Sequence, residues 1–325
     1  MNKNMEYIYK IYQEGGFSKA AKALYISQPA LSAIVRRTER QLHATLFDRS
    51  QNPVRLTPAG EYYIRCIERI QAIEREMEGY FADLSGGSRG TLAIGSGAYY
   101  CTYVLPGLIR RFQAQYPQVQ ISLLEDISDQ RTQKLSQGQL DFMVDVNELR
   151  SPGLESQVIA RENMILAVPA SFAGNEKLRG CRLTFEEVRQ GRHLNGDIPC
   201  VDMSAFRDHP FILLKQGNHS HDLLKKLCQL GGFEPRQAVI SLDQLLTAYY
   251  MACEGAGITV LRDTTLLHVA YTPSLFFYKL PAQLSQRSVY LSYSKSAKER
   301  ALIRLFLDFL RSHPGPFELL EKEDT

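Results

Sequence analysis

Helix-stopping and helix-capping residues divide the first 57 residues of this 325-residue chain into three short helical segments. The run Asn4 to Glu14 has apolar residues at helical spacing, and Gly15-Gly16 ends it. Ser18 is a good N-cap for a second helix over Lys19 to Tyr25, and Ser27 is a good N-cap for a third. The residues expected to face inward on the third helix are Leu31, Val35 and Leu42, with Thr38 between them.

The charge of the chain is concentrated at this end. Residues 1–57 contain nine Lys or Arg residues and four acidic residues, a net +5, while the whole chain is only +3. The remainder is therefore mildly acidic, at −2. A small basic head on an acidic body is typical of a nucleic-acid-binding module joined to a second function.

The second and third helices, joined by a short turn, fit a helix-turn-helix. One face of the third helix carries Gln28, Pro29, Ser32 and Arg36. The major groove of DNA admits one helix, in which Gln and Ser reach base edges while Arg holds phosphate or guanine. The alternative is a solvated polar face on a three-helix core.

Residues 17–60 resemble the winged helix-turn-helix of LysR-type transcriptional regulators. The resemblance rests on several short matches in fixed order, and it extends more weakly over nearly the whole chain. It implies a DNA-binding regulator that is not an enzyme, with double-stranded DNA as its partner. The matching residues are Ala20-Ala21, Ser27-Gln28-Pro29-Ala30-Leu31-Ser32, Leu46-Phe47-x-Arg49 and Leu56-Thr57-Pro58-Ala59-Gly60.

The resemblance also implies which residues contact DNA. The reading face would be on the third helix, with arginines near phosphates and a wing over Phe47 to Leu56. For each arginine, a surface salt bridge is the alternative. The sequence departs from the family pattern at Ala33, Thr38 and His43; the last stands where a helix-ending Gly is frequent, so backbone strain is expected there. The implied DNA-binding set is Ser27, Gln28, Pro29, Ser32, Arg36, Arg37, Arg49 and Arg55.

Residues 58–88 predict a long linker helix and a hinge. Pro58 can start the helix, and Ser85-Gly86-Gly87-Ser88 ends it. A second copy of the chain is the simplest partner for its apolar stripe, and the resemblance agrees, which implies a homodimer or homotetramer. The alternative is packing against the chain's own body. The stripe consists of Tyr62, Ile64, Ile67, Ile70, Ile73 and Met77.

Residues 90–325 alternate between predicted strands and helices, which indicates an α/β domain with a largely parallel sheet. A helix is expected over Thr102 to Gln115. The resemblance implies a periplasmic-binding-protein-like effector domain of two subdomains, the first at about 90–162 and 268–325, the second at about 163–267. The stretch between Pro169 and Pro210 is a candidate insertion. Together these features predict an all-α winged helix-turn-helix, a linker helix and an α/β effector domain.

A small-molecule effector is expected in the cleft between the subdomains. Open α/β sheets bind ligands at the carboxyl ends of strands, near helix N-termini. Hydroxyl and backbone N–H groups there suit a carboxylate, and Lys215 adds positive charge. Asp145 could instead recognise an amine, which would make the effector an amino acid. The expected effector-binding residues are Ser96, Gly97, Tyr99, Tyr100, Thr102, Ser128, Asp145, Lys215, Gln216 and Asn218.

Other chemical signals in the sequence are weak. Gly95-Ser96-Gly97 lacks the third glycine of a dinucleotide fingerprint, and no catalytic motif appears. His219 and His221 form only a lone HxH pair, so neither a cofactor nor a metal is expected. Cys101 near a helix start could have a lowered pKa and sense oxidants.

The N-terminus lacks the apolar core of a signal peptide, and no stretch is long enough to span a membrane. We therefore expect a cytoplasmic regulator, with RNA polymerase as a further partner if it activates. The alternative function is a cytoplasmic small-molecule-binding or enzymatic α/β protein with a helical appendage.

Overall fold

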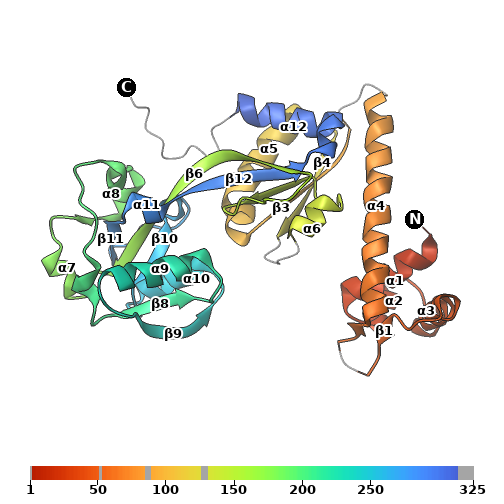
Figure 1. Ribbon diagram of the computed structural model, residues 1–325, viewed down its shortest axis with the longest axis horizontal. Helices are drawn as coiled ribbons and strands as arrows, with labels where there is room; N and C mark the ends of the chain where they lie inside the picture. Colours follow the sequence, from red (N-terminus) through yellow and green to blue (C-terminus); the bar gives the residue numbers. More distant parts are fainter. Residues whose placement is uncertain (1, 51–52, 85–88, 126–130, 314–325) are drawn as a thin grey trace. The chain divides into compact units, whose positions relative to one another are not determined.

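The computed structural model describes residues 2–50, 53–84, 89–125 and 131–313. Contacts divide the chain into two compact units (Figure 1). The first comprises Met1–Gln157 and Leu291–Ser312, and the second has Val158–Tyr290 as its main part. The expected hinge at residues 85–88 and Ser128 lie outside the described residues.

The first unit begins with a winged helix-turn-helix. Its helices α1, α2 and α3 and the two strands of the wing surround one core, into which the following long helix α4 also packs. Buried Ile8, Phe17 and Val35 are among its residues. The elements are α1 (Lys3–Glu14), α2 (Phe17–Ala23), α3 (Gln28–Leu42), β1 (Phe47–Asp48), β2 (Arg55–Leu56) and α4 (Pro58–Leu84), with β1 and β2 antiparallel.

Capping groups set the ends of these helices. Ser27 Oγ accepts the Ala30 N–H at 3.3 Å, as expected for the N-cap of α3. Helix α3 ends in a Schellman motif, in which Ala44 N–H donates to Glu39 O and His43 N–H donates to Arg40 O. His43 follows the end of α3 with a φ of 51°, in the left-handed region that favours glycine. The backbone strain expected from having His in place of Gly at this position is therefore present.

Two sequence expectations for this part are wrong in detail. Helix α2 covers Phe17–Ala23 with Gly16 as N-cap, so Ser18 lies inside its first turn and Tyr25 lies beyond its end. Phe17 begins the helix because its ring is buried against the core. Leu42 is 44% exposed, since α3 ends at this residue and the inward stripe stops at Thr38.

The apolar stripe of α4 is buried in its first part and exposed further along the helix. Ile64 and Ile67 are buried in the helix-turn-helix core. For these two residues, the stripe therefore packs against the chain itself, which was the alternative to pairing with a second copy. Ile73 and Met77, further along, are 63% and 54% exposed. Gly60 lets the start of α4 approach the wing, because a Cβ there would lie 2.0 Å from Leu46 O.

The first unit continues with a parallel sheet. Strand β3 pairs in parallel with β4 on one side and β5 on the other, as the sequence predicts. Figure 1 shows α5 and α12 near one another beside these strands. Buried Phe112 of α5 lies edge-on to Phe306 and Phe309 of α12. The elements are β3 (Gly90–Ser96), α5 (Leu105–Gln115), β4 (Val119–Glu125), α6 (Arg131–Ser136), β5 (Phe142–Asp145), η5 (Ser296–Glu299) and α12 (Ala301–Ser312).

The helix expected over Thr102 to Gln115 is divided. A π-helical turn η1 (Tyr100–Val104) precedes α5, and Pro106 lies in the first turn of α5. Proline has no N–H to donate and its ring clashes with the carbonyl four residues before it, which here belongs to Thr102. The π-helical turn η1 therefore lies where Pro106 prevents a regular α-helix from continuing.

The second unit is built around antiparallel pairing, unlike the largely parallel sheet expected. The long strand β6 pairs antiparallel with β10 and β11, and β11 pairs antiparallel with β7. Strands β8 and β9 pair in parallel, and Phe211 forms a further parallel bridge with Ile258. The strands are β6 (Leu154–Pro169), β7 (Arg182–Leu183), β8 (Pro210–Leu214), β9 (Arg236–Leu242), β10 (Thr259–Arg262), β11 (Leu275–Lys279) and β12 (Gln286–Ser294).

The helices of the second unit connect these strands. They are α7 (Gly174–Lys177), α8 (Phe185–Arg189), η2 (Arg192–Leu194), η3 (Met203–Phe206), α9 (His219–Leu230), α10 (Leu245–Cys253), η4 (Asp263–Leu267) and α11 (Ala282–Ser285). The candidate insertion between Pro169 and Pro210 is part of the core, since Val188 and Phe206 are fully buried. No helix of the described residues is long and apolar enough to cross a membrane.

The boundary of the second unit differs from the one expected at residues 163 and 267. The chain enters this unit at Val158 and leaves it after Tyr290, within β6 and β12. The later exit follows from β11, whose residues pair with Ala167 of β6 and Leu183 of β7. That pairing holds residues 268–290 in the second unit.

Candidate nucleic-acid interface and effector site

The structure places the expected reading residues together at the start of α3. Gln28 and Pro29 are the first two residues of the helix and are exposed, and Ser32 is half-buried one turn later. Ser27 is occupied as the N-cap. Leu31 and Val35 are fully buried on the opposite side, so the core fixes which face α3 presents to solvent.

The four expected phosphate-contacting arginines differ in their environment. Arg49 forms an ion pair with Glu39, with Nη2 and Oε2 3.2 Å apart, and its guanidinium lies 4.6 Å from the centre of the Phe17 ring. Arg36, Arg37 and Arg55 are exposed and form no ion pair within the described part of the chain. The salt-bridge alternative is therefore observed for Arg49, whose charge is already compensated.

Glu39 connects the third helix to the wing. Its Oε1 accepts the N–H groups of Leu46 at 2.8 Å and Phe47 at 3.4 Å, while Oε2 accepts from Arg49. Within the wing, hydrogen bonds from the Ser50 hydroxyl and N–H lower the pKa of Asp48. These contacts fix the wing against α3, and the sequence analysis missed the role of Glu39.

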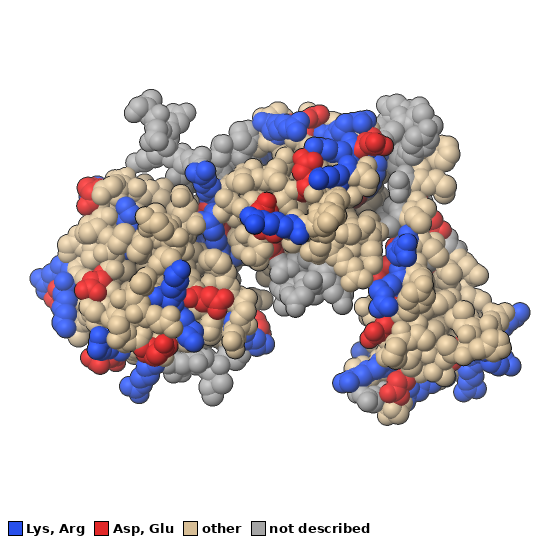
Figure 2. Space-filling view, viewed as in Figure 1, with Lys and Arg blue, Asp and Glu red and all other residues tan. Residues whose placement is uncertain are grey.

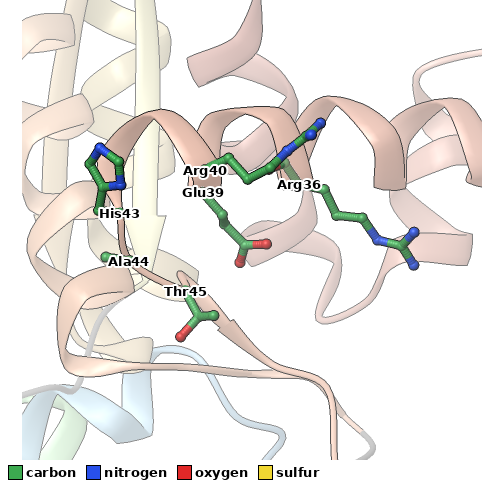
Figure 3. Close-up of a pocket in the computed structure, with 6 residues that line it drawn as sticks. All are labelled: Arg36, Glu39, Arg40, His43, Ala44 and Thr45. Carbon is green, nitrogen blue, oxygen red and sulfur yellow. The ribbon is translucent and has the colours of Figure 1, made fainter.

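Two open hollows follow one another between the end of α3 and the wing. The first has a volume of about 630 Å³. The second, of about 700 Å³, continues it toward the wing and shares Arg36, Glu39 and Thr45 with it. Figure 2 shows Lys and Arg side chains mainly along the edges of the helix-turn-helix part, whose visible face is otherwise mostly uncharged, with a few acidic side chains among them. The first hollow, at the end of α3, is lined by Arg36, Glu39, Arg40, His43, Ala44 and Thr45 (Figure 3).

Arg40 and His43 were also missed, although a signal existed. They follow Arg36 at spacings of four and three residues, which places all three on one face of a helix. The face expected from the sequence ended at Arg36. Continuing the helical spacing to the end of α3 would have included both residues.

The expected effector residues of the first unit lie at the carboxyl ends of β3 and β5. Because Ser96 and Val144 are register partners, Asp145 ends its strand beside Ser96. Ser96 is fully buried and its hydroxyl donates to Val144 O at 2.7 Å, so this side chain holds the sheet together. Asp145 is buried and accepts the Asn147 N–H.

The segment after β3 is more open. Gly97 and Tyr99 are half-buried and Thr102 is exposed, whereas Tyr100 is buried. The rings of Tyr99 and Tyr100 contact edge to face, with centres 5.4 Å apart, and Tyr99 also contacts Tyr103. Thr102 thus presents its hydroxyl to solvent, while Tyr100 contributes to packing.

The expected effector residues of the second unit follow β8. Lys215 forms an exposed ion pair with Asp243, with Nζ and Oδ1 2.7 Å apart. Asn218 is the N-cap of α9 and accepts the Ser220 N–H at 2.9 Å. Gln216 is exposed between them. The charge of Lys215 is therefore already compensated by Asp243, and the side chain of Asn218 is occupied in capping α9.

The histidine pair and Cys101 fit no metal or redox site. His221 Nδ1 lies 2.7 Å from Leu214 O and His219 Nδ1 lies 3.2 Å from an Arg287 nitrogen, so the two rings have separate partners. The described residues contain no group of three or more metal-ligating side chains. Burial, with a smaller contribution from nearby Glu125, raises the pKa of Cys101 to about 11, so the thiol is less reactive than expected.

Comparison with known proteins agrees with this architecture. Residues 3–61 match the family model described as "Bacterial regulatory helix-turn-helix protein, lysR family", and residues 85–315 match "LysR substrate binding domain". The chain is 32% identical over 264 residues to an uncharacterized HTH-type transcriptional regulator, YcgK, of Bacillus subtilis, with 79% of this chain and 78% of that protein covered.

Further relatives match over a shorter length. A probable RuBisCO transcriptional regulator of Cyanidioschyzon merolae is 36% identical over 162 residues, which covers 49% of this chain and 54% of that protein. The chain therefore spans about half the length of this relative.

Among solved structures, the LysR family transcriptional regulator CbnR has a TM-score of 0.66 at 19% identity, covering 99% of this chain and 100% of CbnR. A structure of full-length CbnR with its target DNA has a TM-score of 0.65 at 20% identity, over 96% and 99% of the two chains. These likenesses show the fold. The two family models together cover most of the chain, which belongs to the LysR family of DNA-binding transcriptional regulators, proteins with an effector-binding domain and no enzymatic activity.

Proposed function

We propose that this regulator reads DNA with the exposed start of α3 and holds the backbone with arginines on the same head. The observation that carries the proposal is the exposure of Gln28 and Pro29 beside the N-cap Ser27, on a helix whose opposite face is buried. Gln can make paired hydrogen bonds to a base edge in the major groove. Arg36, Arg37 and Arg55 are free of ion pairs within the described residues and supply the backbone contacts.

Two substitutions separate base reading from backbone binding. Gln28→Ala should lower the preference for the favoured base at its position by about 1–3 kcal/mol, because a base contact is lost. Arg55→Ala should weaken binding to all duplexes nearly equally, because a phosphate contact carries no sequence information. Affinities for duplexes that differ at single base pairs, measured with both variants, test the assignment. Unchanged affinity and base preference in Gln28→Ala would exclude the groove role.

We further propose that the exposed part of α4 pairs with a second copy of the chain, which forms a homodimer or homotetramer. Ile73 and Met77 lie exposed on a helix whose earlier apolar residues are buried. Apolar side chains one turn apart on a helix are the usual contacts of a helix pair. This arrangement would bring two reading heads to one DNA.

The effector that we propose is a small carboxylate or amino acid. The carboxyl ends of β3 and β5 place the segment from Gly97 to Thr102 beside Asp145, and Thr102 offers an exposed hydroxyl. Lys215, which belongs to the second unit, is exposed and paired with Asp243, so any anion that it bound would have to compete with that carboxylate. Binding that differs between two arrangements of the regulator would change its affinity for DNA.

A thermal-shift screen against small carboxylates, amino acids and aromatic acids tests the effector proposal. A ligand at 100 times its dissociation constant stabilises the folded protein by about 2.7 kcal/mol. Thr102→Ala should reduce the shift, and Thr91→Ala, a change of the same residue type at the amino end of β3, should not. A shift that survives in Thr102→Ala would place the ligand elsewhere.

A further inference from the structure

We propose that the hollow at the end of α3, named here the helix-end hollow, binds a phosphate of the DNA backbone through Arg36 and Arg40. It is lined by these arginines with Glu39, His43, Ala44 and Thr45. The inference rests on the proposed DNA binding and adds Arg40 and a defined phosphate position to it. The occupant is a phosphodiester group of the strand that passes between the reading helix and the wing.

The charge of the helix-end hollow favours an anion. Arg36 and Arg40 are exposed, and within the described residues neither forms an ion pair. Glu39 is the one acidic residue of the lining, and its carboxylate is occupied by two backbone N–H groups and by Arg49. Two uncompensated guanidinium groups therefore remain, and these bind phosphate with paired N–H donors.

The direction of the side chains places this charge on the DNA-facing side. Gln28, Ser32 and Arg36 follow one another at four-residue spacing, and Arg40 continues the row. Arg40 Nε–H donates to Arg36 O at 3.4 Å, which turns its side chain back along the helix. Figure 3 shows both guanidinium groups extending along α3 away from His43, while the Glu39 carboxylate points off the helix, toward the chain that follows it.

The neighbouring hollow is less suitable for phosphate, although it also contains arginine. Its lining adds Asp48 and Arg49 to the shared residues. Arg49 is already paired with Glu39, and hydrogen bonds from Ser50 favour the charged form of Asp48 by lowering its pKa. An anion is therefore repelled there by Asp48, and the helix-end hollow is the better position.

The dependence of DNA affinity on salt tests the proposal without knowledge of the operator. Each phosphate contact contributes about 0.9 to the slope of log K against log salt concentration for duplex DNA. Arg40→Gln in the full chain, titrated with a duplex of arbitrary sequence, should lower the slope by about 0.9 for each head that is bound. Arg40→Lys keeps the charge and should keep most of the slope.

Lys10→Gln is the matched control. It removes the same charge from the same head, but Lys10 lies on α1 and is paired with Glu14 at 2.9 Å. Its slope should equal that of the unaltered protein. An Arg40→Gln slope equal to that of Lys10→Gln, with both variants folded by circular dichroism, would overturn the phosphate position while the proposed DNA binding stands. Absence of salt-dependent binding in the unaltered protein would instead refute the proposed DNA binding.

Discussion

Tyr25 and His43 have positive φ angles of 55° and 51°, the only such non-glycine residues of the described part of the chain. Both follow the ends of helices in Schellman motifs. After α2, Ile26 N–H donates to Ala21 O and Tyr25 N–H donates to Lys22 O, the same pattern as at His43. The left-handed conformation is thus required by the helix ends, and a side chain other than Gly is strained there.

Replacement of Tyr25 by glycine should therefore stabilise the head. Tyr25 is 96% exposed, so Tyr25→Gly loses almost no packing while it removes the strain of a Cβ at positive φ. We expect a gain of about 0.5–1 kcal/mol in the free energy of unfolding, measured by chemical denaturation. Ala23→Gly, two residues earlier and inside α2, is the control and should destabilise by about 1 kcal/mol. Destabilisation by both changes would contradict the strain at Tyr25.

The thiol of Cys101 should react slowly with alkylating reagents. Burial is the main cause that raises its pKa to about 11, so the thiolate is a minor form at neutral pH. The rate should rise tenfold for each pH unit up to about 11 and then level off, as peptide mass spectrometry after brief iodoacetamide treatment can show. All six cysteines should react in denaturant. Rapid labelling of Cys101 in the native protein at neutral pH would revive the oxidant-sensing alternative.

Residue chemistry alone could not predict several of these environments. The resemblance located Arg49, but its partner Glu39 lies ten residues earlier on another element, so the ion pair depends on how the wing packs on α3. Ser96 has the residue type of a ligand-binding position, yet its direction is set by pairing with Val144. The position of Gln28 and Pro29 at the start of α3 could be predicted, because a helix cap is a local feature.

At the scale of elements, a buried histidine and aspartate join the stretch between Pro169 and Pro210 to the rest of the second unit. His193 of η2 and Asp263 of η4 are 2% and 1% exposed, and His193 Nε2 lies 3.0 Å from Asp263 Oδ2. Asp263 also accepts from Asn163 Nδ2 at 3.2 Å and from the Thr264 N–H at 2.8 Å. The aspartate therefore satisfies donors from three separate segments.

Removal of this carboxylate should destabilise the second unit strongly. Asp263→Ala leaves three donors without their acceptor, and each unsatisfied buried group costs about 1–3 kcal/mol. Asp197→Ala is the control, because its ion pair with Arg192 is exposed, and it should change stability by less than about 0.5 kcal/mol. Chemical denaturation compares the two. Equal effects would show that the buried pair does not anchor this stretch.

The sequence predicted elements better than their pairing. The helices of the head and the order β3, α5, β4 follow from caps, turns and spacing, which are local, whereas the wing was implied by the resemblance. The helix expected over Thr102 to Gln115 is split after Val104, because Pro106 lies in the first turn of α5. The antiparallel partners of β6 could not be predicted, because Ile165 pairs with Leu261 and Lys279, about a hundred residues away.

For the whole molecule, the two strands β6 and β12 carry the chain between its units. The sequence predicted that the chain enters the second unit at about 163 and leaves it at about 267, whereas contacts divide the chain at 158 and 290. The return could not be read from composition, since residues 268–290 belong to the second unit only through the long-range pairing of β11.

Pairing of whole chains should depend on the exposed part of α4. Charged residues at Ile73 and Met77 would be buried without partners in a helix pair, so Ile73→Asp with Met77→Asp should reduce the mass of the particle, measured by sedimentation. Tyr25→Asp, at an exposed position on the head, is the control and should keep the mass. A double variant with unaltered mass would show that the chains associate elsewhere.

Selection of duplexes from a random-sequence pool by the intact chain tests the central claim most directly. A regulator that reads bases with Gln28 and its neighbours on α3 should enrich a defined motif, and Gln28→Ala should lose preference at particular positions of that motif while still binding the pool. Retention of DNA without any enriched motif would contradict the account, because it would leave backbone binding as the only function of the head.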